Sequence, residues 1–162
     1  MIEIRNLHHR YPDGTYALKG IDLNILKGEF LLICGPNGSG KTTLLRIISG
    51  LLKPSAGSIH INGLDPLHNS REVRCIVGIV FQDPDSQIIG ETVKEDVAFG
   101  PENLGLSLKE INERVDRALQ VMGLRDLSEK PCYLLSGGEK RRLAIAGVIA
   151  MEPQVILFDE PF

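Results

Sequence analysis

One glycine-rich segment limits the possible folds of this chain more than any other part of the sequence, Gly35-Pro36-Asn37-Gly38-Ser39-Gly40-Lys41-Thr42. It matches the pattern G-x-x-x-x-G-K-[ST], in which backbone N–H groups curl around phosphate oxygens at a helix N-terminus. An apolar run at residues 30–34 predicts a preceding strand, buried on both faces of a parallel sheet, and residues 44–48 have helical spacing. A glycine-rich turn that binds no ligand is the alternative. The sequence therefore predicts an α/β fold built around a phosphate-binding loop.

The first third of the chain has the patterning of β structure. Alternating apolar and polar residues predict half-buried strands, at residues 2–4, 21–25 and 58–61. Pro12 and Gly14 favour a turn between the first two of these segments, and Asn62-Gly63 favours a hairpin-type turn after the third. Two later runs are apolar throughout and predict buried strands, at residues 76–81 and 155–158.

From about residue 90 the patterning becomes helical. Sequences of the form Ser/Thr-x-x-Glu have the spacing of a helix capping box, and they begin at Thr92, Ser107 and Ser136. After Ser107, apolar residues recur at helical spacing until Gly123 ends the run. The sequence therefore predicts an α/β protein with a helical subdomain rather than two independent domains.

Composition and charge exclude several classes of protein. Hydrophobic residues make up 43% of the chain and charged residues 24%, a balance that argues against intrinsic disorder. The 18 Lys and Arg residues against 21 Asp and Glu residues give a net charge of −3, so a strongly basic nucleic-acid-binding protein is not expected. The sequence has no apolar run long enough for a membrane helix and no secretory signal pattern. These features predict a soluble intracellular protein.

The cysteines and histidines do not form a disulfide or metal-binding pattern. Cys34, Cys75 and Cys132 are isolated, and the four histidines are scattered. We interpret the cysteines as small buried hydrophobic residues in a reducing compartment. A metal site built from histidines is the less favoured alternative.

Two carboxylates, Asp159 and Glu160, follow the apolar run at residues 155–158. Ligands of open α/β sheets bind at the carboxyl ends of the strands. Asp159 is therefore predicted to hold Mg²⁺ through water, and Glu160 to orient or deprotonate an attacking water. In the glycine-rich loop, Lys41 can reach β- and γ-phosphates, and the Thr42 hydroxyl can ligate Mg²⁺. The alternative for the two carboxylates is a strand that leads into a polar loop.

A second candidate for anion binding is Leu135-Ser136-Gly137-Gly138-Glu139. Ser136 and Glu139 can act as an ordinary capping box. Two consecutive glycines in a first helical turn, however, each cost about 1 kcal/mol in helix propensity relative to Ala. Capping does not require that loss, whereas close approach of the backbone to an anion does.

Together these motifs resemble those of the nucleotide-binding subunits of ABC transporters, and the resemblance runs the length of the chain. Residues 35–42 are similar to the Walker A motif, residues 135–139 to the family signature, and residues 155–160 to the Walker B strand with its catalytic Glu. The resemblance implies a phosphate-loop NTPase fold with a RecA-like core, an N-terminal antiparallel β subdomain and an inserted helical subdomain. The implied division is residues 1–82 and 151–162 for the core and β subdomain, and residues 83–150 for the helical subdomain.

The resemblance also implies an ATPase that uses ATP and Mg²⁺ and works as a head-to-tail dimer. Each ATP then lies between the phosphate loop of one subunit and the signature helix of the other. Glu160 and Gln82 are the implied catalytic residues, and Thr42, Gln82 and Asp159 the implied Mg²⁺ ligands. Tyr11 would stack on adenine, with a surface Tyr at a strand end as the alternative. The residues expected to contact the nucleotide are Tyr11, Gly35, Pro36, Asn37, Gly38, Ser39, Gly40, Lys41, Thr42, Thr43, Ser136, Gly137 and Gly138.

A narrower resemblance lies in residues 81–89 and 92–103, which are similar to the ATPases of energy-coupling-factor importers, the cobalt/nickel and vitamin type. In those proteins the Pro-acidic-x-Gln segment, here residues 84–87, helps to form the surface that grips the coupling subunit. The resemblance implies a homo- or heterodimer of ATPase subunits, a transmembrane coupling subunit, no nucleic acid, and a peripheral position at the cytoplasmic face of the cell membrane. Taken without the family, the stretch is a polar turn followed by a capped helix.

The chain departs from the family pattern after Glu160-Pro161. The family continues with a loop that signals across the dimer and a strand whose histidine contacts the γ-phosphate. That strand lies between the phosphate-loop strand and the Walker B strand, so both are expected to have an unpaired edge. We therefore expect a truncated form or a fragment. A non-catalytic nucleotide-binding fragment and a soluble ABC ATPase of translation or DNA repair are the alternative functions.

Overall fold

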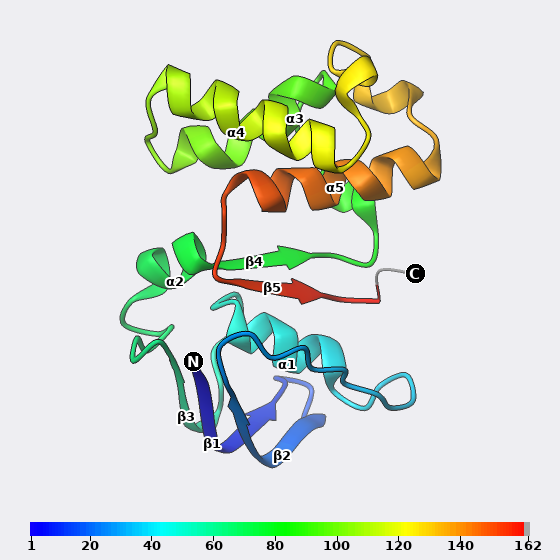
Figure 1. The fold of residues 1–162 in the computed structure, drawn as a ribbon. Helices are drawn as coiled ribbons and strands as arrows, with labels where there is room; N and C mark the ends of the chain where they lie inside the picture. The colour runs from blue at the N-terminus through cyan, green and yellow to red at the C-terminus, as the bar shows by residue number, and fades with distance from the viewer. Residues whose placement is uncertain (161–162) are drawn as a thin grey trace. The chain divides into compact units, whose positions relative to one another are not determined.

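The computed structural model describes residues 1–160 of the chain, which divide into two compact units (Figure 1). The first unit is Met1–Arg74 and the second begins at Cys75. The boundary falls inside helix α2 (Ser70–Ile76), an element that the sequence patterns do not predict. The predicted helical region, residues 83–150, lies within the second unit. Among residues 1–160, no helix combines the length and the apolar character needed to cross a membrane.

The first unit contains an antiparallel sheet whose strands run in the order β2-β1-β3. These strands are β1 (Ile2–Arg10), β2 (Tyr16–Ile25) and β3 (Ala56–Ile61). They confirm the three predicted strands, each longer than its alternating segment. Helix α1 (Lys41–Ile48) packs against β2, as the apolar spacing predicts. The core of the unit consists of side chains that are at most 4% exposed, including Ile2, Ile4, Leu7, Leu18, Ile47, Ile48, Ile59 and Ile61.

A bulge in β1 decides which of its side chains face the core. The pairing of β1 with β2 shifts register between Ile4 and Leu7, where Asn6 has a φ of 44°. A β-bulge adds one residue to a strand and re-aims the side chains that follow it. After the bulge, Leu7 and His9 are buried, whereas Arg10 is exposed.

Both predicted turns of the first unit are confirmed. After β1, Gly14 N–H donates to the carbonyl oxygen of Tyr11 at 2.9 Å. After β3, Asn62 and Gly63 have φ values of 51° and 80°, the left-handed pair that a tight hairpin turn of type I′ requires.

The apolar run at residues 30–34 is not a strand, so this prediction is wrong. Phe30 is 91% exposed and Leu32 71% exposed. Within residues 1–160, neither sheet includes this segment. A strand is stabilised by its backbone ladder and its cross-strand side-chain pairs. Apolar composition predicts the need for burial, but it does not supply the neighbouring strand.

The second unit combines a parallel strand pair with a layer of helices (Figure 1). Strand β4 (Val77–Val80) pairs in parallel with β5 (Val155–Phe158). Helix α5 (Gly137–Ala150) packs on β4 with one side and on α3 (Val93–Asn103) and α4 (Leu108–Val121) with the other. Short 3₁₀ helices complete the unit: η1 (Pro84–Ser86), η2 (Arg125–Leu127) and η3 (Cys132–Leu134).

All three predicted capping boxes are present at the starts of α3, α4 and α5. In each, the hydroxyl oxygen of the N-cap residue accepts a hydrogen bond from the backbone N–H of the Glu three residues later, at 3.3 Å. The Glu carboxylate accepts a hydrogen bond from the N-cap N–H in return. These boxes are encoded locally, which is why the sequence predicts them correctly.

Two predictions of burial are wrong in part. Strand β5 forms where expected, but Ile156 is 38% exposed and Phe158 42% exposed, because β5 pairs only with β4 among the described residues. Of the cysteines, Cys132 is buried as expected, whereas Cys34 and Cys75 are exposed. Cys34 lies at the end of the run at residues 30–34, which belongs to neither sheet of the described residues.

Candidate functional site

The glycine-rich loop leads into α1 through a left-handed residue that must be glycine. Gly40 is the N-cap of α1 and has a φ of 94°. A Cβ atom at this position would lie 2.5 Å from the carbonyl oxygen of Ala17 in β2. Both the backbone conformation and the close approach of β2 therefore exclude any side chain.

Lys41, the first residue of α1, extends back over the loop. Its Nζ donates hydrogen bonds to the carbonyl oxygens of Gly35 at 3.0 Å and Pro36 at 3.3 Å. The backbone N–H of Ser39 donates to the Pro36 carbonyl at 3.2 Å, which closes the turn. Residues 35–39 are all exposed. The loop thus presents a cation and exposed backbone at a helix N-terminus, the combination that binds phosphate groups.

Tyr11 is held against the start of α1. Its hydroxyl forms a hydrogen bond with the Thr43 hydroxyl, with 3.0 Å between the oxygens. Its ring stands edge-on to the buried His9 ring, with centroids 4.7 Å apart. The structure therefore brings two of the predicted nucleotide-contacting residues, Tyr11 and Thr43, into direct contact.

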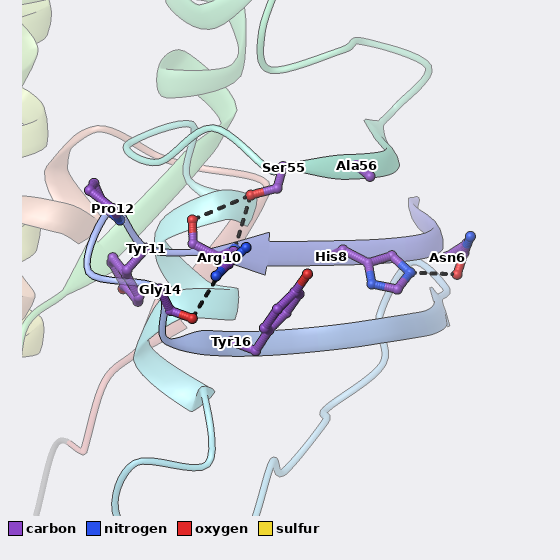
Figure 2. A pocket seen from close by; sticks show the side chains of 9 residues that line it. All are labelled: Asn6, His8, Arg10, Tyr11, Pro12, Gly14, Tyr16, Ser55 and Ala56. Carbon is purple, nitrogen blue, oxygen red and sulfur yellow. Dashed lines mark hydrogen bonds between the residues drawn. The ribbon is translucent and has the colours of Figure 1, made fainter.

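An open hollow of about 730 Å³ adjoins Tyr11 (Figure 2). The Arg10 guanidinium lies 5.0 Å from the centre of the Tyr16 ring, and its Nε donates to the Gly14 carbonyl at 3.1 Å. Of the lining residues, only Tyr11 is a predicted site residue, whereas Pro12 and Gly14 are predicted only to form a turn. The available signal was the alternation of β1, which gathers polar side chains on one face. The hollow is lined by Asn6, His8, Arg10, Tyr11, Pro12, Gly14, Tyr16, Ser55 and Ala56.

In the second unit, the ends of β4 and β5 bring together the two residues predicted to be catalytic. Gln82 Nε2 donates a hydrogen bond to Glu160 Oε2 at 3.1 Å. Asp159, the residue directly after β5, is 7% exposed, and its N–H donates to the Val80 carbonyl at 2.9 Å. Glu160 has a left-handed φ of 50°, a strained conformation for a residue with a side chain.

Oxygen atoms suited to Mg²⁺ are present at this strand end. Mg²⁺ prefers carboxylate, hydroxyl and amide oxygens. Asp159 supplies a buried carboxylate, and Gln82 retains its amide oxygen because Nε2 donates to Glu160. In the first unit, Thr42 follows Lys41 in α1 and supplies a hydroxyl. The chemistry of Asp159 and Gln82, both in the second unit, therefore fits a magnesium ion.

The N-terminus of α5 holds the second predicted anion-binding segment. Ser136 caps the helix, and Glu139 closes the capping box. Hydrogen bonds from Ser136, from its N–H above all, lower the pKa of Glu139 below its ordinary value. Neither Gly137 nor Gly138 has a positive φ, and a Cβ atom on either would meet no atom within 4 Å. Within the described residues, therefore, neither conformation nor packing demands glycine at these two positions.

This chain is similar to known ATP-binding proteins of ABC transporters. The ABC transporter family model matches residues 18–162. The energy-coupling factor transporter ATP-binding protein EcfA of Methanocaldococcus jannaschii is 49% identical over 164 residues, which cover 99% of this chain and 59% of that protein. Among solved structures, cbiO1 of Clostridium perfringens, described as part of the ABC transporter complex cbiONQ, has a TM-score of 0.85 and 44% identity, covering 97% of this chain and 64% of that one.

A second solved structure is the ATP-binding cassette MJ0796, a dimer in a post-hydrolysis state bound to ADP and Pi. Its TM-score is 0.87 at 34% identity, covering 99% of this chain and 74% of that one. The chain spans about three fifths of the length of the curated relatives it matches. The predicted resemblance to ABC transporter ATPases, and to their energy-coupling-factor subgroup, is confirmed. The chain therefore belongs to the ABC transporter family and has the fold of its phosphate-loop NTPase domain.

Proposed function

We propose that this chain binds and hydrolyses ATP as part of an ATPase subunit that powers an energy-coupling-factor importer for a cobalt or nickel ion or a vitamin. The observation that carries the proposal is the phosphate loop, with Gly40 in the left-handed conformation and Lys41 drawn over the loop. The similarity to proteins named EcfA and cbiO1 supports the choice of importer.

Nucleotide binding is assigned first to the loop and its helix. Its backbone N–H groups and Lys41 bind the β- and γ-phosphates, because an exposed glycine-rich turn at a helix N-terminus attracts negative charge. The hydrogen bond to Thr43 fixes the Tyr11 side chain, whose ring stacks on adenine. The loop residues in this role are Gly35, Pro36, Asn37, Gly38, Ser39 and Gly40.

Hydrolysis is assigned to the residues at the ends of β4 and β5. Glu160 accepts a proton from the attacking water or orients it, and the hydrogen bond from Gln82 holds its carboxylate in place. Thr42, Gln82 and Asp159 would hold Mg²⁺, which supplies neutralisation of the phosphate charge. The buried environment of Asp159 supports this role, because a carboxylate kept from water interacts more strongly with a cation.

The signature segment is assigned to the nucleotide site of a partner, which is a second copy or a close relative of this chain. Ser136, Gly137 and Gly138 complete the nucleotide site of the partner, because the two glycines are exposed to solvent and nothing within residues 1–160 requires glycine at either position. The second partner is a transmembrane coupling subunit, which would place the ATPase peripherally at the cytoplasmic face of the membrane. The relative cbiO1, described as part of a transporter complex, supports this assignment.

A second candidate function is nucleotide binding without hydrolysis. The exposed run at residues 30–34 favours it, because the segment that enters the phosphate loop belongs to no sheet among residues 1–160. Catalysis demands tighter positioning of the reacting groups than binding does.

Titration with a fluorescent ATP analogue, together with a phosphate-release assay, tests the proposal. Lys41→Ala is expected to abolish binding or nearly so, because the phosphates would then face only amide groups. Lys109→Ala, at an exposed residue of α4, is the matched control and should bind normally. Glu160→Gln is expected to retain binding and to lose turnover. Equal affinities for Lys41→Ala and the unaltered chain would disprove the assignment of the loop, and binding without turnover in the unaltered chain would favour the second candidate.

A further inference from the structure

The segment that joins β4 to α3, residues 81–92, makes side-chain hydrogen bonds and an ion pair with its surroundings, here called ties. None of the catalytic assignments explains these ties. Gln82 stands near the start of this segment and reaches Glu160. The ties involve Asp85 and Gln87 from the segment itself, and Lys140 and Asp96 from the helices around it. All of them lie in the second unit.

Gln87 uses both ends of its amide group. Its Oε1 accepts a hydrogen bond from the backbone N–H of Phe81 at 3.0 Å, directly before Gln82. Its Nε2 donates to two carbonyl oxygens, that of Ile79 in β4 at 3.4 Å and that of Ala144 in α5 at 3.3 Å. Because one end only accepts and the other only donates, this arrangement specifies an amide side chain. Gln87 therefore connects the start of the segment to strand β4 and to helix α5.

A second tie joins the segment to the first turns of α5. Lys140 Nζ donates to Asp85 Oδ1 at 2.6 Å, and the Lys140 side chain is only 20% exposed. Lys140 follows the capping residue Glu139, so this ion pair holds the segment close to the glycines of the signature. The Asp85 side chain is 64% exposed, so the pair is partly screened by solvent, and we rank it below Gln87.

A third tie fixes the far end of the segment. Asp96, a buried residue of α3, accepts hydrogen bonds through Oδ1 from the N–H groups of Ile89 at 2.7 Å and Gly90 at 2.9 Å. Because Ile89 and Gly90 are held on α3, the segment has little freedom to rearrange when the hydrogen bonds of Gln87 are lost. A disturbance at Gln87 is therefore expected to reach the backbone of Phe81 and Gln82.

We propose that Gln87 is a positioning residue: it fixes the backbone from which Gln82 reaches Glu160, and it couples that backbone to α5, the helix that begins with the signature. Its kinetic consequence rests on the proposed ATP hydrolysis. Its structural consequence, the protection of the Phe81 amide, does not. Gln87 acts through Gln82, because its amide group bonds the backbone of Phe81, Ile79 and Ala144.

Hydrogen exchange at the Phe81 amide tests the tie without reference to activity. In Gln87→Ala the amide loses its acceptor, so its exchange should become faster, whereas Gln87→Glu keeps an acceptor but loses the donors to Ile79 and Ala144. We expect an intermediate rate for Gln87→Glu. Gln120→Ala, at an exposed glutamine of α4, is the matched control and should leave the Phe81 amide unchanged. Unchanged exchange in Gln87→Ala would overturn the proposal.

Steady-state kinetics then tests positioning. We expect Gln87→Ala to lower kcat about tenfold with little change in KM, because misplacement of a catalytic group acts on the chemical step. The double variant Gln82→Ala, Gln87→Ala should be no slower than Gln82→Ala alone, since Gln87 acts through Gln82. Fully additive losses, or a rise in KM without a fall in kcat, would contradict the positioning role. If the unaltered chain releases no phosphate, the proposed hydrolysis fails, and the exchange rates alone decide on the tie between Gln87 and Phe81.

Discussion

Some residues in this chain are required by their own backbone conformation, and others by contacts with residues far away in the sequence. Gly40 must be glycine for a reason that is almost local, its left-handed φ at the start of α1, reinforced by the carbonyl of Ala17. Gln87 owes its role to Ala144, a residue 57 positions away in the sequence. A short motif therefore predicts Gly40, whereas no spacing pattern identifies the bonds of Gln87.

The cysteines provide a prediction at this scale. Burial raises the pKa of the Cys132 thiol to about 11, and the charges of Asp96 and Glu95 add to the effect. Only the thiolate reacts with alkylating reagents, so Cys132 should resist modification near neutral pH in the folded chain. Cys34 and Cys75 are exposed and should react.

The measurement is mass spectrometry of the chain after brief treatment with a maleimide reagent. We expect modification at Cys34 and Cys75, and at all three cysteines after unfolding in guanidinium chloride. Cys132→Ser should leave the modification of the other two unchanged. Rapid modification of Cys132 in the folded chain would show that its burial has been assigned incorrectly.

Among the elements, the helices of this chain begin at signals that are local in the sequence, whereas the strands depend on pairing with distant segments. The capping boxes of α3, α4 and α5 each require a hydroxyl and a carboxylate three residues apart, and all three helices begin where those residues stand. A strand, in contrast, forms only where a neighbouring strand is available to pair with it. The run at residues 30–34 is as apolar as β5, yet β5 pairs with β4 and the run has no partner among the described residues.

The capping carboxylates predict how stability depends on pH. Hydrogen bonds from Ser136 lower the pKa of Glu139, and those from Ser107, its hydroxyl first, lower the pKa of Glu110, both from an ordinary value of 4.5. A carboxyl whose pKa is lower in the folded state contributes stability that is present above the unfolded-state pKa. This contribution is lost as pH falls below 4.5 through the lowered folded-state pKa.

Chemical denaturation followed by circular dichroism, from neutral pH down through pH 4.5, checks this expectation. Glu139→Gln should lower stability at neutral pH and flatten its dependence on pH, while the stability of the two chains converges in acid. Glu129→Gln, at an exposed carboxyl outside a capping box, serves as the control. A pH dependence that is as steep in Glu139→Gln as in the unaltered chain would contradict the assignment.

At the scale of the whole molecule, the chain consists of two compact units that carry different parts of the proposed function. Met1–Arg74 contains Tyr11 and the phosphate loop, and the second unit contains Gln82, Asp159 and the signature helix. The exposed apolar run at residues 30–34 belongs to the first unit. Exposed apolar segments with unpaired backbone groups promote association between copies of a chain.

Polar substitutions in this run test its exposure. Because Phe30 and Leu32 are mostly exposed, Phe30→Asn and Leu32→Asn should each change the free energy of unfolding by no more than about 0.5 kcal/mol. Both should reduce self-association measured by light scattering. Ile4→Asn, in the fully buried core of the same unit, is the contrasting control and should destabilise by several kcal/mol, roughly 3 or more. A comparable loss in Phe30→Asn would mean that the run is buried after all.

Features that depend on residues close together in the chain can be predicted from the amino-acid sequence alone. The phosphate loop, the two turns and the capping boxes each arise from residues within a few positions of one another, and so does each separate motif on which the family resemblance rests. Their conformations are set by local steric and hydrogen-bonding constraints, so a pattern of residue types is enough to predict them.

Features that depend on residues far apart in the sequence emerge only when the chain folds. Folding leaves residues 30–34 outside both sheets of the described part of the chain and exposes Cys34 and half of β5. It also brings Gln82 to Glu160 and Gln87 to Ala144. Apolar composition says that a segment gains free energy when it is buried, but not which surface will bury it. Strand pairing and side-chain contacts across 57 or 78 positions arise only once the chain has folded, because each requires two segments to meet in space.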